Sequence, residues 1–369
     1  MANARKNEFS PNIVFPPGDT LRETITSMDM SQADLALRMG VTEKHINEVI
    51  KGRATITEGT ALKLEKVLGV DASFWRNLEH QYRKHLAEQE ERERLSQKYE
   101  WLSDFPLKKM ISRKWISGFD DKVNQLAELL AYFGVATWES WQNIWIEQAA
   151  FRKSPVFQSN PKAIAAWLRR GEILAQTTDC EPFDKKAFKY LLPKLRELST
   201  QPLSAYLPQI QELCSECGVV VVFVPELPET RVSGVARWLH KNKALIQLSG
   251  RYKKDDHFWF TLFHEAGHIL LHGKKEVFLE DEGQERANDK ETEANTFAAN
   301  MLIPPKEYTK LTKCGKPSLN QIQDLARKLG IAPGIVVGRL QHDRILPFSQ
   351  GNNLKRDINL EQDLKSRSS

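Results

Sequence analysis

His264-Glu265-Ala266-Gly267-His268 reads as H-E-x-x-H and lies inside an apolar stretch of a 369-residue chain. Residues four apart share one face of a helix, so both imidazoles can reach a single metal ion, with Glu265 beside them as a base. The apolar run 258–263 leads into the motif, and runs at 219–225 and 244–249 are expected to form strands. The alternative interpretation is a buried amphipathic helix whose histidines are only hydrogen-bonded.

A third metal ligand is expected from the next segment, because a catalytic zinc ion usually has three protein ligands and leaves one position to water. Residues 291–302 have apolar side chains at helical spacing, and Pro304 ends this helix. Its carboxylates Glu291 and Glu293 lie about 200° apart around the helix, so they cannot both face one metal ion. We favour Glu291, because Asn295 lies one turn further on and could hydrogen-bond a ligating imidazole. Glu293 is then expected to face solvent or a basic neighbour.

The two motifs together resemble the ImmA/IrrE family of zinc metallo-endopeptidases. The second motif reads E-x-x-A-N-x-F-A-A-x-x-L over residues 291–302, and the resemblance covers about residues 215–310. It implies Glu265 as the catalytic general base and a protein as the substrate. The residues that it implies as ligands of Zn²⁺ are His264, His268 and Glu291. His272, one turn after the second ligand, is expected to support the site from behind or to pack.

Peptide hydrolysis also needs a donor that stabilises the oxyanion and a surface that holds the substrate. His240 and Tyr308 are both plausible donors, and nothing in the neighbouring sequence selects between them. The strand expected at 243–249 could hold an extended peptide by pairing along an exposed edge. Both suggestions are hypotheses that the fold must decide.

The front of the chain carries a different pattern, a series of short helices over residues 21–68. Ser31 can cap one helix, Gly40 permits a turn and Thr42 can cap the next helix, which is the order of a helix-turn-helix. The second helix of such a unit lies in the major groove of DNA. The candidate DNA-contacting residues are Gln32, Thr42, Glu43, Lys44, His45, Asn47, Lys51 and Arg53.

This part is similar to the Xre-type helix-turn-helix and, more narrowly, to HigA-type antitoxins over about residues 15–82. The stretches that carry the likeness are 30–36, 49–53, 61–64 and 68–78. It implies binding to operator DNA and allows for a toxin partner. Acidic and basic residues nearly balance between Gly18 and Lys84, so affinity would depend on a local patch or on a homodimer. The alternative is a helical bundle that contacts only proteins.

Composition limits the class of protein. The net charge of +5 is compatible with nucleic acid but does not indicate it, and four cysteines are too few for a disulfide framework. Cys214 and Cys217 have C-x-x-C spacing, but no second pair accompanies them. No apolar run has the length of a membrane span, and the polar first residues are no signal peptide. We therefore expect a cytoplasmic protein without a membrane partner.

The chain is expected to divide into five parts. These are a helix-turn-helix domain at 15–82, a charged helical linker at 83–100, a helical middle region of unknown role at 101–213, a metallopeptidase domain at 214–345 and a polar tail at 346–369. The tryptophans of the middle region are expected to form core. Residues 318–340 read as helix, glycine turn and helix, but Pro333 and Gly334 stand where base-reading residues would begin, so we interpret them as packing. The tail after Asp357 is expected to fray.

The predicted fold is mainly α with a small α+β domain: an N-terminal five-helix bundle, a helical middle region and a C-terminal zincin-like domain with a short mixed sheet. The favoured function is a DNA-binding transcriptional regulator whose zinc-dependent endopeptidase domain cleaves a repressor or itself to control gene expression. The alternative is a non-enzymatic HigA-like repressor or antitoxin with a structural or sensory metal site. Glu265 favours the enzyme, because a structural zinc site needs no base and takes a fourth protein ligand.

Overall fold

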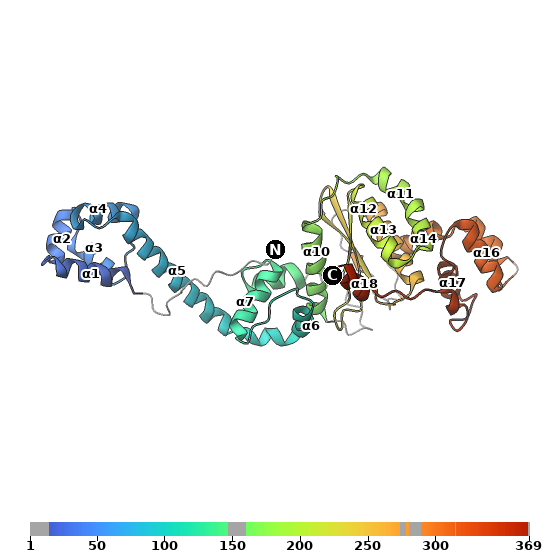
Figure 1. The fold of residues 1–369 in the computed structure, drawn as a ribbon, viewed down its shortest axis with the longest axis horizontal. Helices are drawn as coiled ribbons and strands as arrows, with labels where there is room; N and C mark the ends of the chain where they lie inside the picture. Colours follow the sequence, from blue (N-terminus) through green and yellow to red (C-terminus); the bar gives the residue numbers. More distant parts are fainter. Residues whose placement is uncertain (1–14, 147–159, 274–277, 280–288, 314, 368–369) are drawn as a thin grey trace. The chain divides into compact units, whose positions relative to one another are not determined.

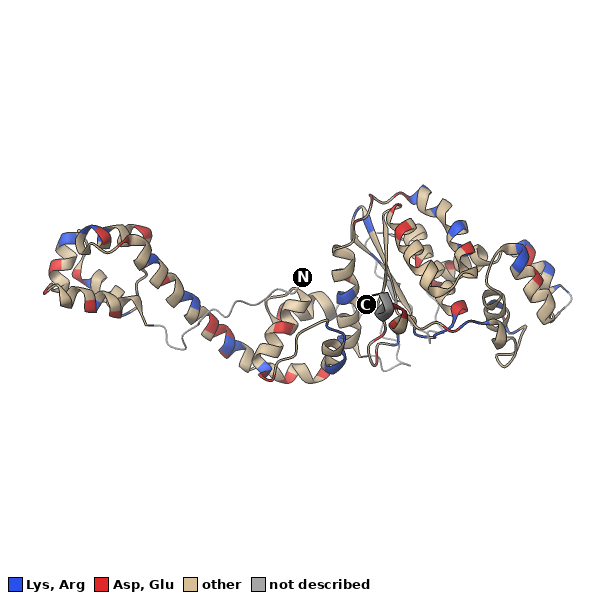
Figure 2. Ribbon diagram, in the orientation of Figure 1, with Lys and Arg blue, Asp and Glu red and all other residues tan. Residues whose placement is uncertain are grey.

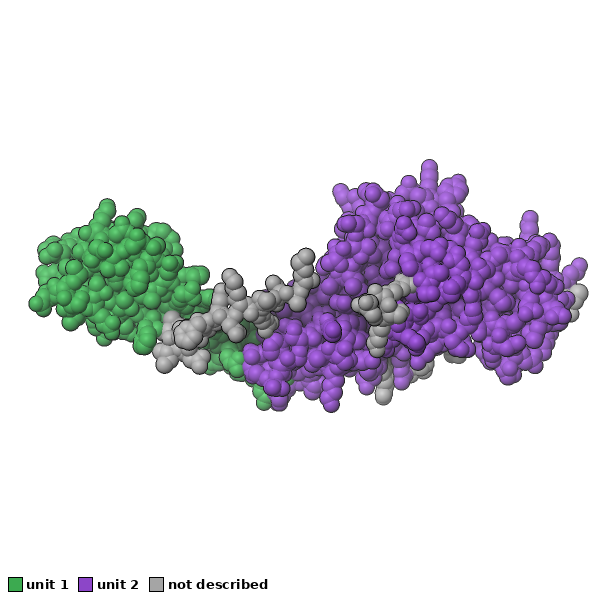
Figure 3. Space-filling view, in the orientation of Figure 1, with its two compact units in different colours: residues 1–99 green, residues 100–369 purple. Residues whose placement is uncertain are grey.

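The computed structural model describes residues 15–146, 160–273, 278–279, 289–313 and 315–367 (Figure 1). The chain forms two compact units, residues 1–99 and residues 100–369 (Figure 3). In the described ranges, no helix has both the length and the apolar character that a membrane span requires. The predicted fold class, mainly α with a small mixed sheet, is confirmed.

The first unit is a bundle of five helices. They are α1 (Pro17–Ser27), α2 (Gln32–Met39), α3 (Glu43–Ile50), α4 (Glu58–Leu68) and α5 (Ala72–Ser96). Ser31 and Asp34 form a capping box at the start of α2, and Gly40 ends the helix at φ 62°, a conformation that glycine adopts readily. Leu21, Leu35 and Trp75 are fully buried in the core that the helices share.

The second unit begins with helices that enclose an aromatic core. They are η1 (Tyr99–Asp104), α6 (Leu107–Ser112), α7 (Lys122–Phe133), α8 (Trp138–Trp141), η2 (Gln142–Ile146), α10 (Pro161–Gln176), α11 (Lys185–Glu197), η3 (Leu198–Thr200) and α12 (Leu203–Ser215). Trp101, Phe105 and Trp141 meet edge to face, with ring centroids 4.6–5.5 Å apart. Trp167 is fully buried, so the aromatic side chains of this region form core, as predicted.

A four-stranded sheet lies at the centre of the second unit, in the order β1-β3-β2-β4. The strands are β1 (Val219–Phe223), β2 (Gly234–His240), β3 (Lys243–Leu248) and β4 (Phe278–Leu279). β1 is parallel to β3, whereas β2 is antiparallel to both β3 and β4. Since β3 has hydrogen-bonded neighbours on both sides, the prediction that it pairs with a peptide along a free edge is wrong. β2 was not predicted as a strand.

Helices cover both faces of the sheet, with α10 on one side and α12 and α13 (Asp255–Leu271) on the other (Figure 1). On the α10 side, the amide of Gln247 donates to Trp167 O at 2.7 Å. Gly171 makes this close approach possible, because a Cβ there would lie 1.8 Å from Gln247 Oε1. Alternate residues of the strands, such as Val221 and Ile246, face the other side and join the main hydrophobic core with α13.

The chain after the sheet folds back onto α13. It forms α14 (Asp289–Leu302), α15 (Pro305–Thr312), α16 (Leu319–Leu329), α17 (Pro333–His342), η4 (Asn352–Leu354) and α18 (Leu360–Arg367). Gly334 and Gly338 of α17 lie directly against Asp255 and Asp256, because a Cβ at either glycine would approach a carboxylate oxygen within 2.6 Å. The interpretation of residues 318–340 as packing is therefore confirmed.

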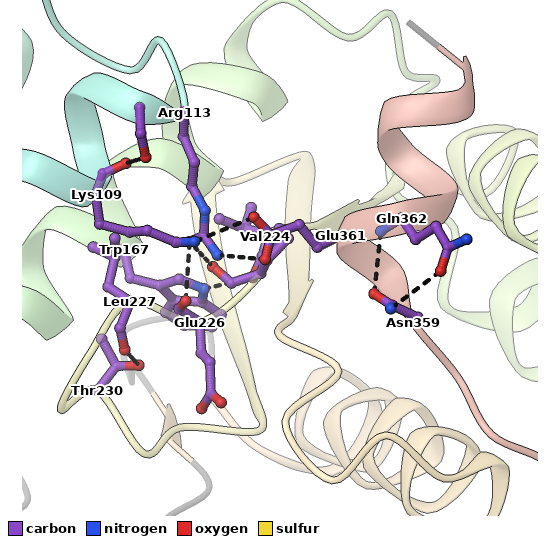
Figure 4. A network of polar contacts seen from close by, with 12 residues as sticks. Lys109, Arg113, Trp167, Val224, Glu226, Leu227, Thr230, Asn359, Glu361 and Gln362 are labelled. Carbon is purple, nitrogen blue, oxygen red and sulfur yellow. Dashed lines mark hydrogen bonds and ion pairs between the residues drawn. The ribbon is translucent and has the colours of Figure 1, made fainter.

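Residues 358–361 are held by contacts, so the prediction that the chain frays after Asp357 is wrong for this stretch. Ile358 and Leu360 are 3 % exposed. Figure 4 shows Lys109 of α6 and Arg113, the residue that follows this helix, both reaching Glu361 of α18, with Lys109 Nζ and Arg113 Nη2 each 3.3 Å from its carboxylate. Arg113 also donates to the carbonyl of Pro225, which links the tail to the loop after β1.

Candidate functional site

Two histidines of α13 and one carboxylate of α14 converge in the second unit. His264 Nε2 and His268 Nε2 lie 2.9 Å apart, and Glu291 Oε2 lies 3.3 Å from the first and 3.5 Å from the second. The potential ligand atoms of these three residues all lie within 4.8 Å of one another, and no other such group occurs among the described residues. The helical period aligns the two imidazoles, and the packing of α14 against α13 adds the carboxylate.

The three side chains fit a zinc ion. Two imidazole nitrogens and one carboxylate oxygen are the donor set of a catalytic zinc site, with a fourth position left open. Burial lowers the pKa of His268 to about 4 and outweighs the effect of the nearby carboxylate of Glu291, which raises it. The imidazole is therefore neutral near pH 7, and its lone pair is available to a metal ion. His268 lies in the last turn of α13, where the helix dipole favours a cation.

Each candidate ligand histidine has a partner behind it. His264 Nδ1 lies 2.9 Å from Asn295 Oδ1 of α14. His268 Nδ1 lies 2.9 Å from His272 Nδ1, and His272 Nε2 lies 3.1 Å from Glu293 Oε2. The structure thus brings together every metal-site residue named from the sequence. It also adds Glu293, which was set aside as a ligand and which here is exposed and contacts His272.

Glu265 is fully buried on the face of α13 that packs against β2. The first residue of that strand, Gly234, makes room for it. A Cβ at Gly234 would lie 2.8 Å from Glu265 Oε1 and 2.5 Å from Thr261 Cγ2, and real Cβ atoms do not approach so closely. Glycine at the start of β2 therefore allows the carboxylate to lie against the sheet, one residue from a candidate metal ligand.

The two candidate oxyanion donors have other partners in the structure. The hydroxyl of Tyr308 donates to Asp343 Oδ2 at 2.6 Å, and burial, with help from Asp343, raises its pKa to about 12. His240 ends β2, and its Nδ1 accepts a hydrogen bond from the backbone of Asn242 at 3.3 Å. Neither contact selects one of them for the oxyanion.

Burial decides the character of the cysteines near β1. Cys214 and Cys217 are buried, and desolvation raises the pKa of both thiols. A raised pKa keeps a thiol protonated and poorly reactive, so the C-x-x-C spacing marks packing in the structure. Cys314 lies outside the described residues.

The candidate DNA-contacting residues lie on α2, α3 and the turn after α3. Thr42, Glu43, Lys44, Lys51 and Arg53 are exposed, whereas Gln32, His45 and Asn47 are half-buried. Arg53 forms a two-point ion pair with Glu48, at 2.6 and 2.7 Å, and this hydrogen bonding lowers the pKa of Glu48. Figure 2 shows basic and acidic residues interspersed over the first unit. Glu48 therefore offsets the positive charge of Arg53.

Two family models match the chain, one in each unit. A model described as the IrrE N-terminal-like domain, of the Peptidase_M78 family, matches residues 214–341. A helix-turn-helix model matches residues 21–75. The first match includes all three candidate metal ligands and Glu265, and the second includes every candidate DNA-contacting residue.

Individual relatives match part of the chain. Virulence-associated protein I of Dichelobacter nodosus is 36% identical over 88 residues, which are 24% of this chain and 79% of the relative. The uncharacterized HTH-type transcriptional regulator YddM of Escherichia coli K12 is 28% identical over 64 residues, 17% of this chain and 68% of the relative. The structure of an addiction module antidote protein of a HigA family from Coxiella burnetii is 28% identical, with a TM-score of 0.22, and covers 23% of this chain and 94% of that one.

Proposed function

Because the chain belongs to the helix-turn-helix family through residues 21–75 and carries an IrrE N-terminal-like domain at residues 214–341, we propose that it is a DNA-binding transcriptional regulator with zinc-dependent endopeptidase activity. The substrate is a protein, either a repressor or this chain itself, and its cleavage changes gene expression. One observation carries the proposal: His264, His268 and Glu291 converge, with Glu265 next to them in the helix.

The residues of the site divide the work of hydrolysis between them. His264, His268 and Glu291 would hold the metal ion. A zinc ion in such a site supplies a Lewis acid and lowers the pKa of water towards neutrality. Glu265 takes the proton from the attacking water and passes it to the leaving amine. Its burial against β2 keeps the carboxylate in one place and away from bulk solvent.

The DNA-binding part uses the helix-turn-helix of the first unit. We assign residues 15–82 to this domain and residues 214–345 to the peptidase domain. In this proposal α3 enters the major groove, where Asn47 and His45 read base edges and Lys51 contacts phosphate. With acidic and basic residues interspersed over the unit, a homodimer would supply the affinity that one copy lacks.

A Glu265→Gln variant tests the enzymatic proposal. Zinc content should remain as in the wild type, whereas cleavage should fall by about 100-fold or more, because the variant keeps the ligands and loses the base. The probes are the full-length chain itself and a peptide library from a digested proteome, with new termini detected by mass spectrometry. Glu212→Gln, an exposed position on α12, is the matched control.

The outcomes separate the alternatives. Equal cleavage by the wild type and Glu265→Gln would remove Glu265 from the mechanism. A wild type that binds zinc but cleaves neither probe would leave a metal-binding repressor without peptidase activity.

A further inference from the structure

A chain of hydrogen bonds runs from a candidate metal ligand to the surface of α14. It starts at His268, whose side chain is 1 % exposed, and passes through His272, whose side chain is 3 % exposed. It ends at Glu293, whose side chain is 62 % exposed. Two contacts of 2.9 and 3.1 Å connect the three residues. A buried ligand is thereby linked to a carboxylate at the surface.

The protons along this chain can be assigned from one end. A carboxylate only accepts hydrogen bonds, so His272 Nε2 must carry a proton to donate to Glu293. When His272 carries this one proton, its lone pair lies on Nδ1, which accepts from His268 Nδ1–H. The lone pair of His268 is then on Nε2, the atom that faces His264 and Glu291. The carboxylate thus selects the tautomer of His268 that can bind a metal ion.

We propose that Glu293 is a positioning residue, which acts through His272 to hold His268 in its metal-binding tautomer and orientation. The proposal deepens the proposed function, because it rests on zinc binding at the same three ligands. It assigns α14 a contact with each candidate ligand histidine: Glu291 shares the metal ion, Asn295 fixes His264, and Glu293 fixes His268 through His272.

The geometry of the two helices explains why a second histidine is needed. Asn295 reaches His264 directly, since α14 packs closely where Gly267 leaves room for Phe297, 3.0 Å from the position of a Cβ. At the other end of the site, His272 is the first residue after α13 and has extended backbone, with φ −109° and ψ 169°. Its ring fills the distance between His268 and the first turns of α14.

Zinc affinity of the purified full-length chain, measured by competition with a chromophoric chelator, tests the proposal. Glu293→Ala and His272→Phe should each weaken zinc binding by about 10- to 100-fold, the usual effect of losing such a partner. The double variant should lose no more zinc affinity than the single variant with the larger loss, because both residues act through one series of hydrogen bonds. Asp289→Ala removes a carboxylate from the same end of α14 and should stay within about twofold of the wild type.

Two further readings separate positioning from a general loss of structure. Glu293→Gln keeps an oxygen that can accept from His272 Nε2–H, so it should recover most of the affinity lost in Glu293→Ala. The visible absorption spectrum of bound Co²⁺ should change in His272→Phe and Glu293→Ala but not in Asp289→Ala.

Several results would overturn the proposal. The first is a zinc affinity of Glu293→Ala equal to that of Asp289→Ala. The second is a double variant in which the fold losses of zinc affinity of the two single variants multiply. The third is a wild type that binds no zinc. The zinc-affinity assay contains no substrate, so its result does not depend on peptidase activity. Absence of peptide cleavage would therefore count against the proposed function alone. Unchanged affinity in the variants would count against the positioning role alone.

Discussion

Lys355→Met is expected to destabilise the second unit by about 3–5 kcal/mol, the usual cost of removing one partner from a buried ion pair. Lys355 Nζ lies 2.5 Å from Asp256 Oδ2 and donates to Gln341 Oε1 at 2.7 Å. The side chains of Lys355 and Asp256 are only 8 % and 6 % exposed, so water cannot solvate the carboxylate that the substitution leaves unpaired. Methionine keeps the apolar length of lysine, so the loss reflects the charge and the hydrogen bond to Gln341, with only a small cavity.

This ion pair matters for the metal site because Asp255 and Asp256 form the first turn of α13. Arg356 forms an ion pair with Asp255, although burial raises the pKa of this carboxyl. Asp255 and Asp256 therefore both pair with basic residues of the C-terminal segment. Calorimetry of the full-length chain measures the effect. In a unit of this size each kcal/mol lowers the melting temperature by about 2–4 °C, which predicts a decrease of roughly 6–20 °C.

Two controls sharpen the test. Lys355→Met combined with Asp256→Leu removes both charges and should recover most of the lost stability. Lys254→Met breaks an exposed ion pair with Asp357 and should change the melting temperature far less. A decrease below about 2 °C in Lys355→Met, or a double variant no more stable than the single one, would refute the reasoning.

Three further predictions concern the two functional parts. Gly234→Ala places a Cβ 2.8 Å from Glu265 Oε1, so peptide cleavage should fall by up to about 10²-fold while the zinc content stays constant; an unchanged rate would contradict this. Asn47→Ala should weaken binding to a duplex selected from a random-sequence library by about 1–3 kcal/mol, as measured by fluorescence anisotropy, and Arg53→Ala should cost less because Glu48 already holds Arg53. The reverse order would be inconsistent with the structure. Zinc at 100 times its dissociation constant should stabilise the second unit by about 2.7 kcal/mol, and an unchanged calorimetric transition would exclude specific binding.

The metal site could be predicted from the sequence as far as helical periodicity reaches. His264 and His268 lie together because four residues make about one turn, and Glu291 and Asn295 share a face for the same reason. The contact between Glu293 and His272 could not be predicted in this way. It depends on where the chain leaves α13 and on how α14 crosses it, and neither follows from the pattern of one helix.

The order of the strands was also beyond local pattern. The apolar run of β3 indicates burial but does not indicate which strands flank it. The sequence pattern does not indicate β2, because Arg237 interrupts its apolar residues. In the structure Arg237 is buried and pairs with Glu172 of α10, at 3.4 Å. The buried ion pair at the start of α13 joins Asp256 to Lys355, which lie far apart in the sequence. Tertiary contacts of this kind decide burial and cannot be inferred from spacing.

The zinc content of the purified full-length chain, determined by elemental analysis after zinc is supplied and excess is removed, tests the central claim most directly. We expect about one zinc ion per chain in the wild type and in Glu265→Gln, and a large loss in His268→Ala, because only the last variant removes a ligand. A wild type without stoichiometric metal, or a His268→Ala variant that holds as much zinc as the wild type, would contradict a metal centre at these residues.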